Sequence, residues 1–225
     1  MLQSSIFHFL HQLKENNNRE WFASNKKAFQ VEEQLAKAFF MAVYVDLEKI
    51  DNVDKMQVFR IYRDVRFSKD KSPYKNHFSV GFNRCKPLLR GGMYLHIEDN
   101  ASFVGGGFWE PNAPDLFRIR KEIEVDASEL RAIIGEETFQ KYFKTLQGEE
   151  LKTAPKGFDK THPAIDLLRK KQFLLTRSFT NEQVLSPKFQ TEVLDTFKAM
   201  RPFFDYMSDV LNTDLNGESL WIKHI

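Results

Sequence analysis

Apolar residues in the first fifty positions recur at the spacing of α-helices. Between Ile6 and Leu13 they follow two serines that can cap a helix, and they predict a short helix that ends at the asparagines of positions 16–18. Over residues 19–50 the apolar positions keep a period near 3.6, with charged residues between them, which predicts one long helix. The N-terminal part, residues 1–52, is therefore expected to be helical.

The middle of the chain alternates apolar and polar residues, as strands do. This alternation predicts strands at residues 58–65, 77–83, 92–98 and 101–108. The polar residues 68–73 are expected to form a loop, because Pro73 has no N–H to donate to a ladder. Short strands that follow one another along the chain favour an antiparallel sheet, which we place within residues 56–108.

A helical pattern returns in the last half of the chain. Asn112 is a suitable N-cap, and Pro114 fits the first turn of the helix that follows. The pattern also predicts helices at residues 127–134 and 136–146, a short helix that ends at Lys171, a fifth strand at residues 172–179 and an amphipathic final helix at residues 186–211. The C-terminal part, residues 112–225, is thus expected to be mostly helical.

These elements predict an α+β protein. Its antiparallel sheet has about four to five strands with helices packed on it, and the N-terminal and C-terminal helices are long. At 225 residues, of which 42% are hydrophobic, the chain is long enough to bury a substantial core. Neither an internal repeat nor a long linker is visible, so we predict a single domain that spans residues 1–225.

Composition excludes several classes of protein. The formal net charge is only +2, which argues against a protein that coats polyanions along its whole surface. The single cysteine, Cys85, excludes an internal disulfide and a cysteine-based zinc site, and it favours a cytoplasmic location. No run of about 18 apolar residues and no secretion signal is present, so we expect a soluble protein without a membrane partner.

The densest charge in the sequence lies at residues 60–77, the basic segment. In a strand that includes residues 57–63, Arg60 and Arg63 lie on opposite faces, so at least one arginine leaves an otherwise apolar face. A buried guanidinium needs a partner, and Asp64 and Asp70 are the nearest in sequence. The segment is therefore equally well interpreted as a structural Arg–Asp network or as a binding site for an anion.

In the second interpretation the basic side chains donate to a phosphate or carboxylate. The candidate ligand-binding residues of the segment are Arg60, Arg63, Arg66, Asp70, Lys71 and Lys75. The candidate proton-transfer or orienting residues are Asp64, Tyr74 and His77.

Two later features are candidates for the same site. His96 and Glu98 share one face of a predicted strand, and the glycines around Gly106 would let a backbone approach a ligand, although a β-bulge explains them more simply. A metal site could be assembled from His77, His96, Glu98 and Asp64, but no short-range ligand signature supports it, so we assign no metal ligand and leave cofactors unknown.

Several stretches of the chain together resemble a known family. They are NNREWF at 17–22, RIYRDVRFSKDKSPYK at 60–75, FVGGG at 103–107, LFRIR at 116–120, APKGF at 154–158, HP at 162–163 and the region 171–177. This set is similar to domain-of-unknown-function family 2461, an uncharacterised and mainly bacterial family. The resemblance implies one whole-chain domain in a bacterial cytoplasm, with no established reaction, cofactor or catalytic residue.

The resemblance also suggests that further charged residues belong with the basic segment. These are Arg118, Arg120, Lys156 and Arg177. The leading hypothesis is a protein that binds or processes a small anionic ligand. The alternatives are single-stranded nucleic-acid binding, against which the near-neutral charge weighs, and a structural or partner-binding protein without catalysis. Whether the protein is an enzyme and what its oligomeric state is do not follow from the sequence.

Overall fold

A computed structural model describes residues 1–221, which fold into two compact units. The first unit comprises Met1–Asn83, Tyr94–Val104 and Ser178–Asp195, and the second comprises Arg84–Met93, Gly105–Arg177 and Thr196–Ile225. The chain changes unit inside four of its strands and inside its last helix. A single domain that spans residues 1–225 stays a prediction.

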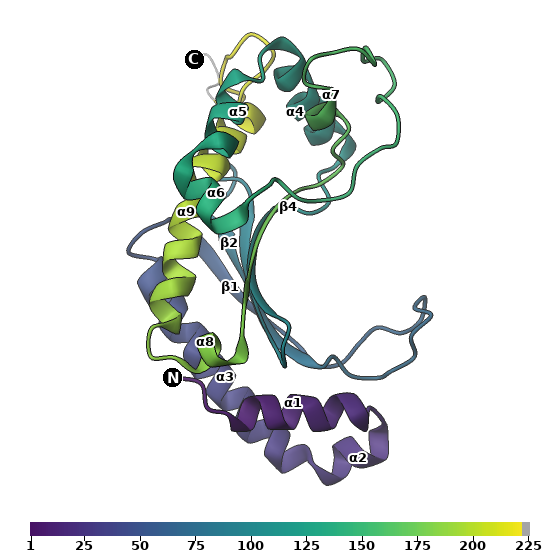
Figure 1. Cartoon of the computed structure of the whole chain (residues 1–225), viewed down its shortest axis with the longest axis vertical. Coiled ribbons are helices and arrows are strands. Elements are labelled where there is room, and N and C mark those ends of the chain that lie inside the picture. Colours follow the sequence, from purple (N-terminus) through teal and green to yellow (C-terminus); the bar gives the residue numbers. More distant parts are fainter. Residues whose placement is uncertain (222–225) are drawn as a thin grey trace. The chain divides into compact units, whose positions relative to one another are not determined.

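The strands form one antiparallel sheet in chain order. They are β1 (Val53–Phe59), β2 (His77–Arg84), β3 (Gly92–Glu98), β4 (Ser102–Phe108) and β5 (Phe173–Phe179). The predicted α+β class, the antiparallel sheet and the helices at both ends of the chain are confirmed (Figure 1). Strands β2, β3, β4 and β5 all carry fully buried apolar residues, so all four contribute to the core.

The N-terminal region contains three helices rather than the two that the sequence pattern predicted. They are α1 (Ser5–Glu15), α2 (Arg19–Ser24) and α3 (Lys26–Leu47), and α1 and α2 both contact α3 (Figure 1). The expected long helix is interrupted at Asn25, whose backbone N–H and side-chain Nδ2 both donate to the carbonyl of Trp21, at 3.0 and 2.9 Å. Asparagine competes for backbone partners in this way, so it ends helices even where the apolar period continues.

The predicted strand at residues 58–65 is wrong in position. Strand β1 ends at Phe59, and the chain then pairs with a later part of the basic segment. Tyr62 and Tyr74 form an antiparallel bridge, flanked by backbone hydrogen bonds from Arg63 to Pro73 (2.9 Å) and from Lys75 to Ile61 (2.7 Å). The apolar alternation after Phe59 therefore reflects this local pairing and not the main sheet.

The turn between α1 and α2 fixes the base of the basic segment. The side chain of Asn17 accepts from the backbone N–H of Tyr74 at 3.1 Å and donates to the carbonyl of the same residue at 3.0 Å. The ring of Tyr74 stacks on Phe22 of α2, with centroids 4.0 Å apart. The ends of the segment are thus ordered, while its middle lies toward solvent.

The remaining helices follow the sequence pattern with several corrections. They are α4 (Ala113–Val125), α5 (Ser128–Gly135), α6 (Glu137–Phe143), α7 (Ile165–Leu168), α8 (Asn181–Leu185) and α9 (Phe189–Asn212). The helix predicted at residues 136–146 ends at Phe143, and the short helix predicted to end at Lys171 ends at Leu168. The predicted cap at Asn112 is confirmed, since its side chain accepts from the backbone N–H of Asp115. The final helix begins at Phe189 rather than at residue 186, and α8, which the sequence analysis missed, begins with a capping box between Thr180 and Gln183. None of the helices described is long and apolar enough to cross a membrane.

Candidate functional site

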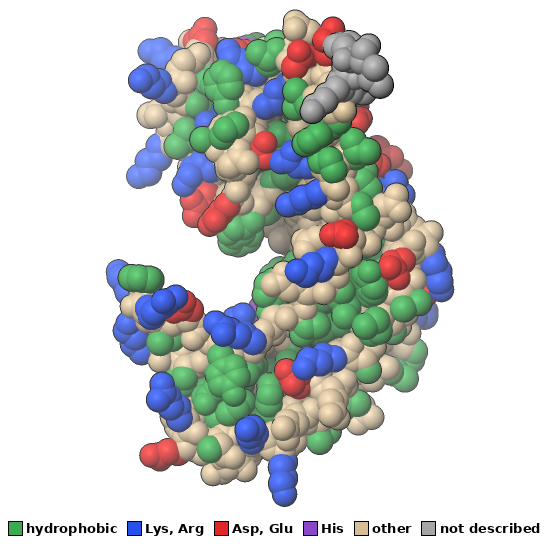
Figure 2. Space-filling view, turned by 180° about the vertical axis from the view of Figure 1, so that it is seen from behind, with side chains coloured by type: hydrophobic (Ala, Val, Ile, Leu, Met, Phe, Trp, Pro, Cys, Tyr) green, Lys and Arg blue, Asp and Glu red, His purple; other side chains and the backbone are tan. Residues whose placement is uncertain are grey.

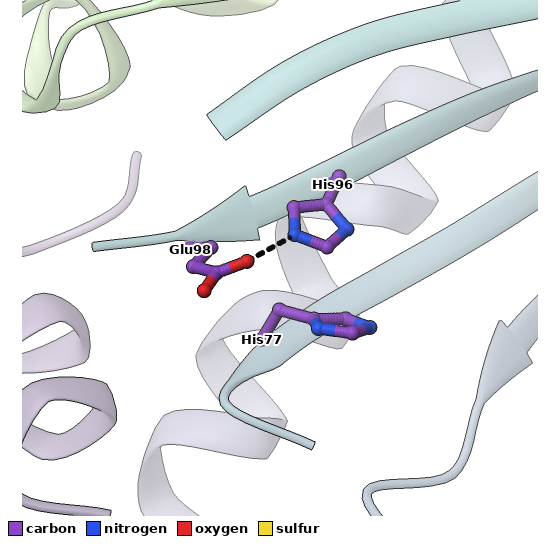
Figure 3. Close-up of side chains that lie close together, drawn as sticks. All are labelled: His77, His96 and Glu98. Carbon is purple, nitrogen blue, oxygen red and sulfur yellow. Dashed lines mark hydrogen bonds and ion pairs between the residues drawn. The ribbon is translucent and has the colours of Figure 1, made fainter. Parts of the chain in front are cut away.

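Three titratable side chains of the first unit converge on one face of the sheet. His77 is the first residue of β2, and His96 and Glu98 lie two positions apart on the neighbouring strand β3. One nitrogen of each histidine and one oxygen of Glu98 all lie within 4.8 Å of one another (Figure 3). We call these three residues the His–His–Glu cluster. Antiparallel pairing of β2 with β3 brings His77 to the other two residues, which lie 19 and 21 positions later in the sequence.

His96 and Glu98 are held from both sides by hydrogen bonds. Nε2 of His96 lies 2.7 Å from Oε2 of Glu98 (Figure 3), and its Nδ1 lies 3.1 Å from the hydroxyl of Tyr94. The other carboxylate oxygen of Glu98 accepts from Nδ2 of Asn76 at 2.9 Å. Both side chains therefore have fixed orientations before any ligand arrives.

His77 is differently placed, because it has a ring neighbour and, within residues 1–221, no polar partner. Its ring centroid lies 4.0 Å from that of His96, and the His96 ring also stacks on Phe103, with centroids 4.7 Å apart. Among the described residues, none forms a hydrogen bond or ion pair with the imidazole of His77. A half-buried imidazole with two unused nitrogens is unusual, since buried polar groups are generally hydrogen-bonded.

Both histidines are neutral at pH 7. Burial, followed by the proximity of His96, lowers the pKa of His77 to about 3. Burial, followed by the charge of Lys75, lowers the pKa of His96 to about 4. The contact between His96 and Glu98 is therefore a hydrogen bond from a neutral ring and not a salt bridge at this pH. A general base works best with a pKa near the operating pH, so a free His77 is poorly matched to that role.

A shallow pocket of about 430 Å³ opens beside the cluster. It is lined by Arg63, Asp64, Lys75, Asn76 and His77. Lys75 is half-buried, and its Nζ lies 5.5 Å from the centroid of Phe59. Burial, followed by the charges of Arg60 and Arg63, lowers the pKa of Lys75. This pocket thus brings two predicted cationic residues, Arg63 and Lys75, together with two predicted proton-transfer residues, Asp64 and His77.

The aspartates of the basic segment pair with its arginines, as the structural interpretation expected. Asp64 accepts from Arg66, which lowers the pKa of Asp64, and both side chains are exposed. Asp70 accepts from Ser72 and from Arg63, in that order of effect, and these bonds lower the pKa of its carboxyl. Arg63 and Arg66 are therefore ion-paired. Arg63 and Asp64 nevertheless both line the pocket.

Other predicted residues of the basic segment lie away from the pocket. Tyr74 is buried against Phe22, and Nζ of Lys71 donates to the carbonyl of Val65 at 2.9 Å. Arg60 is exposed and makes no ion pair with a described residue, although it is near enough to Lys75 to affect its pKa.

The candidates from the C-terminal half belong to the second unit. Arg120 donates to the carbonyls of residues 168 and 170, and Arg177 donates to Thr196 and lies over the ring of Tyr142. Arg118 donates to the carbonyl of Thr213 and to Glu122, whereas Lys156 is exposed. Their suggested association with the basic segment stays a prediction.

Gly106 also lies in the second unit, in a tightly packed position. A Cβ at Gly106 would lie 2.7 Å from Sδ of Met200 and 2.9 Å from the ring of Phe204. Such close packing requires glycine whether or not a ligand is present. Packing against these two side chains therefore accounts for this glycine without a ligand, and the β-bulge that we expected at the glycine run stays a prediction.

Two residues that were not predicted from the sequence, Tyr94 and Asn76, also shape the cluster. Tyr94 shares the strand face of His96 and Glu98, so extending the same alternation by one step would have found it. Asn76 precedes His77, and its role depends on the register between β2 and β3, which the sequence does not specify.

Comparison with known proteins gives a family for this chain. The family model described as "Conserved hypothetical protein (DUF2461)" matches residues 5–206. The chain belongs to the DUF2461 family. The DUF2461 match includes the whole basic segment and the His–His–Glu cluster, and it confirms the resemblance of the sequence. No curated protein and no solved structure matches the chain. The family description assigns no activity, so a function for this DUF2461 protein has to be argued from its residues.

Proposed function

We propose that the first unit binds a small anionic molecule that carries a phosphate or carboxylate group. The proposed site is the pocket lined by Arg63, Asp64, Lys75, Asn76 and His77. Arg63 provides forked donors for such a group, Lys75 provides a point charge, and the amide of Asn76 can orient it. His77 connects the pocket with the rest of the His–His–Glu cluster.

The observation that supports this proposal best is the state of Lys75. Lys75 is a half-buried residue, and its charge is opposed by two neighbouring arginines rather than matched by a carboxylate. No ion pair joins it to any residue of the described range 1–221. Charges that leave water are normally paired, so an anion from solution would supply what the chain does not.

Thermal shift in the presence of anions tests the proposal. A ligand that binds only the folded state raises the melting temperature with its concentration, so phosphate, citrate and a panel of phosphorylated and carboxylated metabolites are the probes. We expect at least one of them to stabilise the wild-type protein and to lose its effect in Lys75→Gln.

The matched control is Lys69→Gln, which removes the same charge from the same segment. Lys69 is exposed and does not line the pocket. A shift that is retained in Lys69→Gln and lost in Lys75→Gln supports the pocket. An equal loss in both variants would show only a general effect of charge, and the absence of a shift with any probe would contradict the proposal.

Single-stranded nucleic acid is a second candidate ligand, because three rings are exposed near the basic residues. Phe59, Tyr62 and Phe67 are 36%, 49% and 96% exposed, and such rings can stack on bases. Tyr74, a further ring of the basic segment, is buried and unavailable for stacking. On the face seen in Figure 2, blue Lys and Arg side chains are scattered among red, green and tan ones, so they form no continuous basic stripe there.

Fluorescence anisotropy with a labelled oligonucleotide separates the two candidates. Nucleic-acid binding predicts affinity that weakens steeply with salt and falls in Phe67→Ala, whereas the anion pocket predicts no dependence on Phe67. Absence of binding at about 50 mM salt would dismiss the nucleic-acid candidate.

A bacterial cytoplasmic setting is part of the proposal. It is supported by the family resemblance and by Cys85, the single cysteine of the chain, which fits a reducing compartment.

A further inference from the structure

The His–His–Glu cluster has the donor set of a transition-metal site. Two imidazole nitrogens and one carboxylate oxygen lie within 4.8 Å of one another on rigid, adjacent strands. Metal–ligand bonds of about 2.0–2.1 Å place the ligand atoms of a tetrahedral ion roughly 3.3 Å apart. Small side-chain rotations therefore suffice to bring the three atoms onto one ion, with no movement of the sheet.

The outer hydrogen bonds match those of protein metal sites. Ligating histidines usually bond through their second nitrogen to a polar group, and ligating carboxylates are hydrogen-bonded in turn. Here Tyr94 lies 3.1 Å from Nδ1 of His96, leaving Nε2 facing Glu98, and Asn76 donates to the oxygen of Glu98 that is turned away from His96. A tyrosine hydroxyl can donate or accept, so it suits His96 in either tautomer.

The state of His77 points to a ligand that the chain itself does not supply. Its ring lies beside that of His96 and borders the pocket, yet it forms no hydrogen bond to the described part of the chain. A neutral imidazole presents a lone pair, which is the form that binds metal ions. An ion between His77, His96 and Glu98 would use this nitrogen and explain why it has no partner.

We infer that His77, His96 and Glu98 bind a divalent transition-metal ion of the Zn²⁺ or Fe²⁺ type. Two imidazoles with one carboxylate are the ligands of catalytic zinc sites and of non-haem iron sites, and they do not suit Ca²⁺ or Mg²⁺. Three protein ligands leave coordination positions on the metal ion open. His77 lines the pocket, so an anion in the pocket could occupy one of these open positions. The metal site itself does not depend on the proposed anion binding.

Lys75 acts against the metal and distinguishes the two proposals. Lys75 lies two residues before His77 and lines the same pocket, so its positive charge opposes a dication bound at His77. The same charge attracts an anion. Removing it should therefore strengthen metal binding and weaken anion binding, which allows one proposal to fail while the other stands.

Calorimetric titration of the full, untagged chain with Zn²⁺ after treatment with EDTA tests the site. We expect one equivalent of Zn²⁺ per chain, and binding at least about tenfold weaker in His77→Ala, His96→Ala and Glu98→Gln. Circular dichroism would confirm that each variant folds. The control is His8→Ala, which removes an exposed histidine of α1 and should leave the titration unchanged.

Cobalt absorption gives a second readout that needs no variant. Co²⁺ bound in place of Zn²⁺ at a site of low coordination number has visible d–d bands, and Zn²⁺ should abolish them by competition. The inference is overturned if the stripped wild-type chain binds neither ion. It is equally overturned if Zn²⁺ binding survives in a folded His77→Ala/His96→Ala variant, because the ion would then lie elsewhere.

Discussion

The hydroxyl of Tyr94 lies 3.1 Å from Nδ1 of His96, on the opposite side of the ring from Glu98. These two residues are neighbours on one face of β3, so the strand alone fixes their relationship. The tyrosine thereby sets which nitrogen of His96 faces Glu98 and His77. Tyr94 therefore positions His96 as a metal ligand and does not itself contact the metal ion.

Tyr94→Phe tests this positioning role. The substitution removes one hydroxyl and keeps the ring that contacts Phe59 and Phe103, so the fold should be retained. We expect Zn²⁺ affinity to fall by about tenfold to 100-fold, the usual cost of losing a group that orients a metal ligand. Calorimetry measures the Zn²⁺ affinity, and thermal melting checks that the variant is folded. Unchanged affinity in a folded variant would show that Tyr94 does not orient His96.

Lys75→Gln should change two affinities in opposite directions. Removal of a charge near His96 favours a dication, whereas it removes an attraction for an anion. We expect Zn²⁺ to bind several-fold more tightly and the stabilising anion to bind at least about tenfold more weakly, both by calorimetry. A fall in both affinities would mean that Lys75 acts through the fold instead.

Arg63 can be tested against its own ion-pair partner. Arg63→Gln and Asp70→Asn break the same pair, but only the first removes a positive charge from the pocket. Asp70 is largely exposed, so each variant should cost less than about 1 kcal/mol of unfolding free energy. If the anion pocket is correct, anion binding weakens in Arg63→Gln and is kept in Asp70→Asn. Equal anion affinity in both would assign Arg63 a structural role only.

The metal-free protein should lose stability as the pH falls below 6.5. The pKa values of His77 and His96 are lowered by burial to about 3 and about 4, so the unfolded chain takes up protons that the folded chain does not. Stability from these groups is complete above pH 6.5 and declines toward pH 4. We expect the free energy of unfolding to drop by about 1–2 kcal/mol per pH unit between pH 6 and 5.

Denaturant unfolding in EDTA measures this slope. His96→Asn lacks one titrating ring and should show a shallower dependence on pH than the wild type. His8→Asn, in which the lost histidine is exposed, should keep the wild-type slope. Identical slopes in all three proteins would show that the histidines of the cluster titrate alike in the folded and unfolded states.

Much of the fold follows from local pattern, whereas its exceptions arise from single polar residues. The strands at Gly92–Glu98 and Ser102–Phe108 were predicted to within a residue because their alternation meets clear turns. The side chain of Asn25 ends a helix because it competes for the Trp21 carbonyl. The spacing of apolar residues does not reveal this competition. The residues after Phe59 look like a longer strand for a different reason. Tyr62 pairs with Tyr74, and apolar alternation does not reveal with which segment a strand pairs.

The candidate site was predictable in its members but not in its arrangement. His96 and Glu98 share a face by spacing alone, and His77 was already suspected. Their convergence depends on the register of β2 against β3, which the long connection between these strands leaves undetermined. The missing hydrogen bonds of His77 are likewise visible only in three dimensions, and they are the reason a metal is now proposed where spacing gave no signature.

Anomalous diffraction from crystals grown with Zn²⁺ would locate the metal ion on the chain. We predict a peak at the zinc edge about 2.0–2.2 Å from one nitrogen of His77, Nε2 of His96 and one oxygen of Glu98. A peak elsewhere on the chain, or none at this cluster at saturating Zn²⁺, would contradict this prediction.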